Sequence, residues 1–292
     1  MHKIKYNHLS AEINPDGAEL SSLVSEGTEL MWQGDEQFWS GRAPILFPIV
    51  GALKNGAMRY HGNRYELPRH GIARHATFEI IEQSESSIAL RLTADNASQK
   101  VYPWNFELQV RFTLSDTGID VRYDIFNHDN TDMLFTIGSH PAFALEINDQ
   151  YSFRDYEISF DHPESLATYQ LNNEGLLDTK PQAFACSENS TAAGTFKLSE
   201  EIFNDDALVF RNIKSKHISL QRNGKVLLTV DTGGAPHLGI WAKPGAPFVC
   251  IEPWLGTSDF IDSSGDFETK PDLQKLAPQQ KYSHGIAISV AR

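Results

Sequence analysis

Apolar and polar residues alternate with a period of two through the middle of the chain. From Phe106 to Leu114 every second side chain is apolar, and a second alternating run covers Ile119 to Ile125. Because successive side chains of a strand point to opposite faces, each run predicts a half-buried strand. Asp116-Thr117-Gly118 supplies turn residues between them, so we expect the two strands to pair as an antiparallel hairpin.

Shorter runs of the same character predict further strands. They cover Ile88–Thr93, Tyr156–Phe160, His217–Arg222, Val226–Val230 and Ile286–Val290. Asn223-Gly224 separates two of them and is typical of a type I′ hairpin turn. Long helical periodicity is missing, and only pieces near 35–39 and 272–276 could form a helical turn or two. Many short strands separated by turns favour an all-β fold, a large antiparallel β-sandwich or barrel, over an alternating α/β fold.

The length of the chain indicates its number of domains, and its net charge excludes some classes of partner. The 292 residues contain no linker-like tract and no internal repeat, so we expect one domain over residues 1–292. The formal net charge is −13, and an acidic surface repels polyanions. We therefore expect neither nucleic acid nor an anionic membrane as a partner. The sequence does not indicate an oligomeric state.

The cysteines and the N-terminal segment indicate the cellular compartment. Cys186 and Cys250 are too few for a disulfide framework and lack the paired spacing of a zinc site. The N-terminal segment has no apolar core of the kind that a secretory signal needs. The longest apolar stretch, residues 43–53, is too short to span a membrane. We expect a reduced cytoplasmic protein.

Several common catalytic motifs are absent. The sequence has no Gly-rich phosphate loop, no dinucleotide fingerprint, no Gly-x-Ser-x-Gly motif and no His-Glu-x-x-His motif. His70 and His75 could suggest metal ligands, but with 11 histidines in the chain such a near pair arises readily by chance. We expect no metal and no cofactor.

Four segments place reactive side chains among small or rigid residues. Residues 42–51 are apolar and contain prolines that cannot sit in a central strand. In residues 68–74 a glycine after His70 permits close backbone approach, and two arginines could clamp oxygen-rich groups. In residues 138–143, His140 precedes a proline that restricts its backbone. Each segment also has a purely structural interpretation. Residues 42–51 could be a bent core segment, residues 68–74 a surface turn, and His140 a buried, hydrogen-bonded histidine.

The fourth segment, residues 248–254, carries the strongest single-residue signal. Glu252 follows an apolar strand and precedes Pro253 and Trp254. A glutamate is almost never fully buried unless it is paired or has a function. We therefore interpret Glu252 as a functional carboxylate.

Together, these four segments resemble those of the aldose 1-epimerase (galactose mutarotase) superfamily, most closely its LacX-like branch. Residues 204–210 and 238–244 also resemble that branch, and the six segments occur in the family's order between about Leu20 and Thr257. The resemblance implies a galactose mutarotase-like supersandwich with a sugar groove across one face. It also implies cofactor-independent interconversion of the α and β anomers of a free aldose.

The same resemblance assigns residues to roles. His140 of Ser-His-Pro-Ala-Phe corresponds to the catalytic acid, and Glu252 of Ile-Glu-Pro-Trp to the catalytic base. His70 resembles the second active-site histidine, and Asp206 the acidic residue that holds sugar hydroxyls.

The sequence departs from galactose mutarotases in the stretch after Val-Gly. Their sugar-binding arginine is missing from Gly51-Ala-Leu-Lys-Asn-Gly56, and we expect Arg74, or in second place Arg42, to replace it. The departure leaves open whether galactose is the substrate.

These residue types suit mutarotation. The reaction removes the O1 proton, protonates the ring oxygen O5 and then reverses, so one base and one acid suffice. An unperturbed glutamate, with a pKa of about 4.3, is ionised at neutral pH, whereas a histidine, with a pKa of about 6.5, is partly protonated. We expect a neighbouring carboxylate, Asp206 or Glu252, to raise the pKa of His140.

Three further interpretations of the sequence stay open. Trp32, Trp241 or Trp254 could lie against the sugar, with core packing as the alternative. Arg42, Lys54, Arg69 and Arg74 could gather around a phosphate, as in a hexose-6-phosphate mutarotase. The same fold could also serve a non-catalytic protein that binds or senses carbohydrate.

Overall fold

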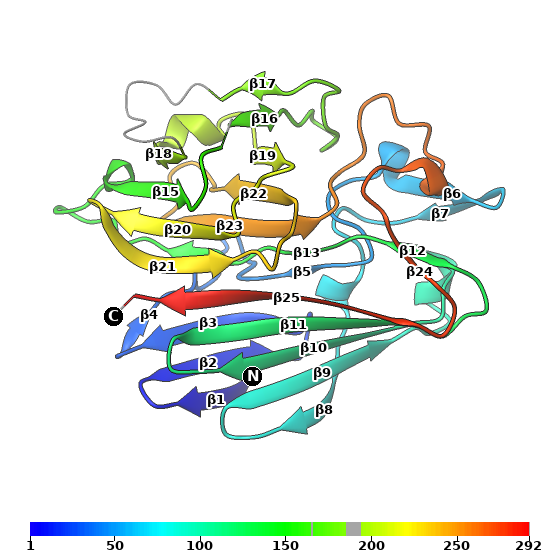
Figure 1. Ribbon diagram of the computed structural model, residues 1–292, viewed down its shortest axis with the longest axis horizontal. Coiled ribbons are helices and arrows are strands. Elements are labelled where there is room, and N and C mark those ends of the chain that lie inside the picture. Colours follow the sequence, from blue (N-terminus) through cyan, green and yellow to red (C-terminus); the bar gives the residue numbers. More distant parts are fainter. Residues whose placement is uncertain (165, 185–193, 292) are drawn as a thin grey trace.

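Antiparallel strands dominate the computed structural model, which describes residues 1–164, 166–184 and 194–291 (Figure 1). The largest sheet has nine strands. In spatial order they are β18 (Thr195–Lys197), β15 (Tyr156–Phe160), β20 (His217–Arg222), β21 (Lys225–Asp231), β25 (Lys281–Val290), β11 (Gly118–Asn127), β10 (Phe106–Leu114), β9 (Ser87–Thr93) and β8 (Glu79–Gln83). Every strand run predicted from alternation lies in this sheet, at or within a few residues of its predicted bounds.

The predicted hairpin is confirmed in detail. β10 pairs with β11 in antiparallel register from Phe106 opposite Asn127 to Leu114 opposite Ile119. Buried and partly exposed residues alternate along all of β10, because one face of the sheet covers the core and the other is solvated. Asn223 and Gly224 both have positive φ, 50° and 76°, as the predicted turn requires.

The second large sheet has eight strands. In spatial order, seven of them are β17 (Gln182–Ala183), β16 (Ala167–Tyr169), β19 (Leu208–Arg211), β22 (His237–Trp241), β23 (Phe248–Leu255), β13 (Ile137–Ser139) and β5 (Ile45–Leu46), and β14 (Ala142–Ala144) also pairs with β23. All residues of β23 are buried. β5 is an edge strand followed by the cis peptide Phe47–Pro48, which agrees with the proline-based expectation for this segment.

Smaller elements complete the described part of the chain. A four-stranded sheet contains β1 (His2–Tyr6), β2 (Leu9–Asn14), β3 (Glu19–Ser25) and β4 (Thr28–Glu29), and two strand pairs contain β6 (Ala57–Tyr60) with β7 (Asn63–Glu66) and β12 (Met133–Phe135) with β24 (Gln274–Leu276). Six short 3₁₀ helices are η1 (Lys54–Gly56), η2 (Ala73–His75), η3 (Ser98–Lys100), η4 (Phe153–Asp155), η5 (Glu200–Phe203) and η6 (Phe267–Thr269). The described residues contain no helix long and apolar enough to cross a membrane.

Of the two short helical pieces predicted from the sequence, the first is confirmed and the second is corrected by the structure. Residues 35–39 form a single turn, in which the backbone N–H groups of Phe38 and Trp39 donate to Asp35. Residues 274–276 are extended and pair with β12, because this strand pairing satisfies the backbone groups that a helical turn would otherwise pair locally.

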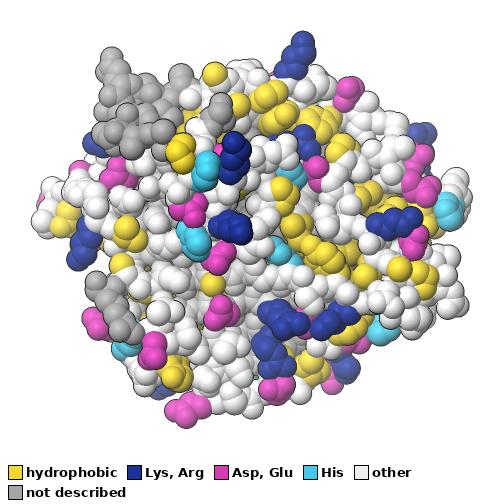
Figure 2. Space-filling model, in the orientation of Figure 1, with side chains coloured by type: hydrophobic (Ala, Val, Ile, Leu, Met, Phe, Trp, Pro, Cys, Tyr) yellow, Lys and Arg dark blue, Asp and Glu magenta, His cyan; other side chains and the backbone are white. Residues whose placement is uncertain are grey.

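The two large sheets share one hydrophobic core, which confirms the predicted all-β antiparallel sandwich. Ile158 and Leu220 of the nine-stranded sheet and Leu238 and Ile240 of the eight-stranded sheet belong to the same buried cluster. Figure 2 shows acidic and basic side chains interspersed over one face of the molecule.

Candidate active site

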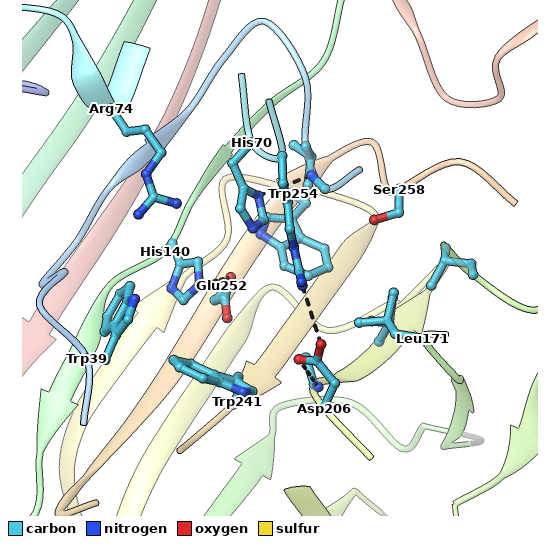
Figure 3. Close-up of a pocket in the computed structure, with 16 residues that line it drawn as sticks. Trp39, His70, Arg74, His140, Leu171, Asp206, Trp241, Glu252, Trp254 and Ser258 are labelled. Carbon is cyan, nitrogen blue, oxygen red and sulfur yellow. Dashed lines mark hydrogen bonds and ion pairs between the residues drawn. The ribbon is translucent and has the colours of Figure 1, made fainter. Parts of the chain in front are cut away.

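A cavity of about 320 Å³ lies against the eight-stranded sheet, within the size range of small-molecule sites (Figure 3). Its walls come from β19, β22 and β23 and from the segments around residues 50, 70, 140, 171 and 258. All five residues that the sequence marked as catalytic or substrate-binding line it: His70, Arg74, His140, Asp206 and Glu252. The structure therefore brings together side chains from widely separated parts of the chain.

The pairing of β23 with its neighbours places Glu252 beside His140. Ala142 pairs with Cys250 and Gly138 with Trp254, so His140, between these partners, lies opposite the middle of β23. His140 Nε2 is 3.3 Å from Glu252 Oε2. Glu252 is 1% exposed and His140 is 8% exposed, so the pair forms a desolvated floor for the cavity.

Burial favours the neutral form of both groups. It lowers the pKa of His140 to about 3, and the charge of Arg74 acts in the same direction. Burial raises the pKa of Glu252 well above its usual range, although Arg69 and Arg74 oppose this shift. The expectation that a neighbouring carboxylate raises the His140 pKa is wrong, because desolvation outweighs the attraction between the two groups. Both shifts favour the state in which His140 is neutral and Glu252 carries the proton.

His70 has a fixed tautomer. Its Nδ1 accepts a hydrogen bond from the backbone N–H of Gly51 at 3.1 Å, so Nε2 carries the proton and is free to donate. Burial and the neighbouring His140 lower the pKa of His70 well below its usual value. A Cβ at Gly71, whose φ is +72°, would lie 2.3 Å from the carbonyl oxygen of Phe47. The close backbone approach predicted after His70 is therefore present.

Two arginines and one aspartate supply the remaining charges. Figure 3 shows the guanidinium of Arg74 pointing toward His140, and among the described residues it has no hydrogen-bond or ion-pair partner. Arg69 Nη2 lies 3.6 Å from Asp206 Oδ2. Asp206 Oδ1 accepts a hydrogen bond from the Ala207 N–H at 2.8 Å, and the φ of Asp206 is +82°. This local bond holds its carboxylate at the cavity wall.

Aromatic rings pack around the imidazole of His140. Trp39 stacks on His140 with ring centroids 4.9 Å apart, and Trp241 meets the same imidazole edge-on at 5.9 Å. Trp241 and Trp254 line the cavity, whereas Trp32 is packed in a neighbouring apolar cluster. Sequence analysis missed Trp39, whose position in a turn gives no strand or motif signal.

Other candidates from the sequence do not reach the cavity. Arg42 donates to the carbonyl of Gln33, and Lys54 donates to the carbonyl of Ile261; neither residue lines the cavity. Of the four cations proposed around a phosphate, only Arg69 and Arg74 do so. His75 is exposed and does not line the cavity with His70. Cys186 lies outside the described residues.

Comparison with known proteins identifies the family. A family model described as aldose 1-epimerase matches residues 2–289. The chain belongs to the aldose 1-epimerase family. Within it, the chain is 30% identical to protein LacX (plasmid) of Lactococcus lactis subsp. lactis, over 98% of both chains.

Solved structures of related proteins share the fold of this aldose 1-epimerase family member. A galactose mutarotase related enzyme from Lactobacillus acidophilus is 30% identical, with a TM-score of 0.92 and 100% and 97% of the two chains covered. A galactose mutarotase-like protein from Lactobacillus casei is 26% identical, with a TM-score of 0.93 and full coverage of both chains.

Proposed function

We propose that this protein is an active aldose 1-epimerase that interconverts the α and β anomers of a free aldose. The observation that carries the proposal is the contact of 3.3 Å between His140 Nε2 and Glu252 Oε2 at the floor of the cavity. A proton acceptor and a proton donor there could both reach one pyranose. We also propose a cytoplasmic location, based on the sequence.

The proposed reaction needs two proton transfers in each direction. Glu252 removes the proton from O1 while His140 donates a proton to O5, and the bond between C1 and O5 breaks. After rotation about the C1–C2 bond, O5 attacks the other face of the carbonyl carbon. Glu252 then returns its proton to O1, and His140 takes the proton from O5. The pair holds one proton before the reaction and one after it, so no cofactor is consumed.

The protonation state of the pair fits this cycle. Neutral His140 with protonated Glu252 is the state that follows ring opening, and burial of both groups favours it in the empty cavity. Ring opening starts from the ionised state with the same number of protons. Hydroxyl groups that donate to Glu252 stabilise its ionised form and shift the shared proton toward His140. Sugar binding would thus prepare the acid and the base together.

We assign the other polar groups to sugar binding. His70 presents an Nε2–H donor, Arg74 presents an unpartnered guanidinium, and Asp206 presents a carboxylate that accepts from sugar hydroxyls. Trp241 and Trp254 offer apolar faces for the C–H surface of the ring. Donors and acceptors on different walls would fix the orientation of the sugar above the acid–base pair.

The two alternative functions receive less support. A hexose 6-phosphate would meet only two of the four cations considered for it, and Asp206 neutralises part of the charge of one of them. A protein that only binds carbohydrate has no need for a buried proton-sharing pair, which costs stability. We therefore favour an enzyme that acts on an uncharged aldose, and comparison of glucose with glucose 6-phosphate tests this choice.

Saturation-transfer NMR of anomer exchange on a panel of aldoses tests the proposal directly. Wild-type protein should accelerate exchange, and Glu252→Gln should lower the rate by about 10²- to 10⁴-fold, the usual contribution of a positioned acid or base. Glu79→Gln, the same change at an exposed residue of β8, should behave as wild type. Near wild-type exchange by Glu252→Gln would contradict the proposal. Equal sugar binding by both proteins with no acceleration by either would favour the binding protein.

A further inference from the structure

A buried thiol completes a cluster of metal-ligating groups at the floor of the cavity. Ligand atoms of His140, Cys250 and Glu252 all lie within 4.8 Å of one another. Cys250 and Glu252 are two residues apart on β23 and therefore point to the same face of the sheet. Within the described residues, no other group of three such side chains comes together in this way.

Two polar atoms of this cluster lack hydrogen-bond partners. His140 Nδ1 and Glu252 Oε2 are buried and make no hydrogen bond with the described residues, although Oε2 lies 3.3 Å from His140 Nε2. An unsatisfied buried polar atom costs about 1–3 kcal/mol. A cation bound between the three side chains would bond to Glu252 Oε2 and so remove the cost at that oxygen.

The spacing of the three groups suits a tetrahedral ion. Zinc bonds of about 2.0–2.3 Å in a tetrahedron place neighbouring ligand atoms roughly 3.3–3.8 Å apart. The contact between His140 and Glu252 already has this length, at 3.3 Å. The two contacts of the sulfur, at most 4.8 Å long, need a contraction of at most about 1.3 Å to reach the roughly 3.5 Å expected for a pair of ligand atoms that includes sulfur. Nitrogen, sulfur and carboxylate oxygen together form a ligand set that suits Zn²⁺ better than Mg²⁺ or Ca²⁺.

We propose that His140, Cys250 and Glu252 form an inhibitory binding site for Zn²⁺. Bonds form from the ion to the imidazole nitrogen, to the sulfur and to a carboxylate oxygen. The thiol proton, and any proton shared by His140 and Glu252, passes to solvent. The fourth coordination position faces the cavity, where His140 and Glu252 are lining residues, and takes a water molecule. The bound ion holds the lone pairs that the reaction needs, so it blocks catalysis.

Cys250 allows binding of the ion to be separated from catalysis. It is fully buried beside Ala142 and Phe248 and does not line the cavity, so a bound sugar does not touch it. Substitution of Cys250 should therefore weaken binding of the ion while leaving mutarotation near the wild-type rate. The inhibition test rests on the proposed function, because it requires mutarotase activity. Binding of the ion does not depend on that function.

The first test measures ion binding without any sugar. Co²⁺ is added to wild-type protein as a spectroscopic probe, because thiolate ligation produces a sulfur-to-cobalt charge-transfer band, and Zn²⁺ binding is measured by competition with Co²⁺. Wild type and Cys186→Ser, which keeps Cys250 as its sole thiol, should both show the band. Cys250→Ser and Cys250→Ala should lose it and bind Zn²⁺ at least tenfold more weakly. Two variants are used because either alone could disturb folding.

The second test measures anomer exchange. Zn²⁺ should inhibit wild type reversibly, with activity restored by a chelator, and should inhibit the Cys250 variants only at concentrations at least tenfold higher. A charge-transfer band that survives in both Cys250 variants, or equal Zn²⁺ affinity in all four proteins, would overturn the proposal. If wild type binds Zn²⁺ through Cys250 but shows no exchange activity, the ion site stands and the proposed function fails. Acceleration of exchange by Zn²⁺ would refute an inhibitory role.

Discussion

The carboxyl group of Glu252, which we propose as the catalytic base, lowers the stability of the fold at neutral pH. Its pKa in the folded protein is raised well above the ordinary value, so the fold prefers the protonated form. The stabilisation from this group is present below pH of about 4.3 and is lost as the pH rises. At neutral pH the ionisable group therefore weakens the fold relative to a neutral amide of the same shape.

From this we predict that Glu252→Gln is at least as stable as wild type at pH 7, although we expect it to lose most of the proposed activity. Thermal unfolding should show an equal or higher Tm for the variant at pH 7. The difference should shrink near pH 4, where the glutamate of the unfolded chain is also largely protonated. A lower Tm for the variant at pH 7 would show that the carboxylate stabilises the fold.

A second prediction at the residue scale concerns the pH dependence of activity. The pH profile of kcat/KM reports the number of protons on the His140–Glu252 pair in the free enzyme, not their position. The pair takes up a second proton, on His140, only below about pH 3, because the pKa of His140 is about 3. We therefore expect no acidic limb near pH 6.5, the ordinary value for histidine. Half-maximal activity near pH 6.5 would contradict the shared-proton state.

Arg74 and Arg42 form a matched pair for testing sugar binding. Arg74 lines the cavity without a protein partner, whereas Arg42 donates to the carbonyl of Gln33 and lies outside the cavity. A hydrogen bond from a charged group is worth about 1.5–3 kcal/mol. We expect Arg74→Gln to lower kcat/KM by roughly 10- to 100-fold, mostly through KM, and Arg42→Gln to have little effect. The reverse pattern would assign the sugar-binding arginine to Arg42.

At the scale of elements, a buried ion pair fixes the loop that follows β23. Lys270 Nζ lies 2.8 Å from Asp259 Oδ1 and donates to the carbonyl of Thr257 at 2.7 Å. Ser258 Oγ accepts the Ala52 N–H at 3.0 Å. These bonds join residues 257–259 to the segment that carries Gly51, which in turn fixes the tautomer of His70.

We predict that Lys270→Met destabilises the protein by about 3–5 kcal/mol, because it leaves the buried Asp259 carboxylate unpaired. Urea unfolding measures this change. The matched control is Lys275→Met, which breaks the exposed pair between Lys275 and Asp132 and should have little measurable effect. Equal midpoints for the two variants would mean that the buried pair contributes nothing beyond its packing.

The elements also show where sequence reasoning works and where it stops. Strands with one solvated face, such as β10, could be predicted to the residue because their pattern has a period of two. The short strands β5, β13 and β14 have no such pattern, since buried residues predominate in all three; β13 and β14 flank His140, and β5 precedes the segment of Gly51. The segment 272–276 was misjudged because pairing with β12 is a long-range event that local residues do not encode.

The site itself was predictable in composition but not in electrostatics. The family resemblance pointed to five of the polar residues that line the cavity, yet it gave no sign of Ser258 or of Trp39, which reaches His140 from a distant turn. The direction of the His140 pKa shift was wrong, because burial depends on side chains from several elements. The sequence shows that a carboxylate could lie near His140, which would raise its pKa. It does not show the desolvation, which lowers the pKa by more.

At the scale of the whole molecule, several histidines are held neutral by the fold. Burial is the main cause that lowers the pKa of His70 well below 6.5, of His140 to about 3 and of His284 to about 4. The unfolded chain binds protons at these positions from about pH 6.5 downward, whereas the folded chain binds them only at lower pH. Acidification therefore favours the unfolded state.

We predict that the free energy of unfolding falls as the pH is lowered from 7 to 5. Once the pH is below the pKa of histidine in the unfolded chain, each of these histidines contributes up to about 1.4 kcal/mol per pH unit. Urea unfolding at several pH values measures the slope, and His284→Gln should reduce it without affecting the cavity. Glu252 opposes this slope, because its raised pKa favours the fold on acidification. A free energy of unfolding that stays constant over this range in both wild type and Glu252→Gln would mean that these histidines are protonated in the fold.

β23 connects the chemistry of the molecule to its folding. Along this strand Cys250, Glu252 and Trp254 face the cavity side, while Val249, Ile251 and Leu255 belong to the main core. A slip of one residue would put a carboxylate into the core and an isoleucine into the cavity. Molecules with a shifted β23 register would thus lose both activity and stability. The specific activity of a refolded sample should therefore be proportional to the fraction of molecules in which β23 has its native register.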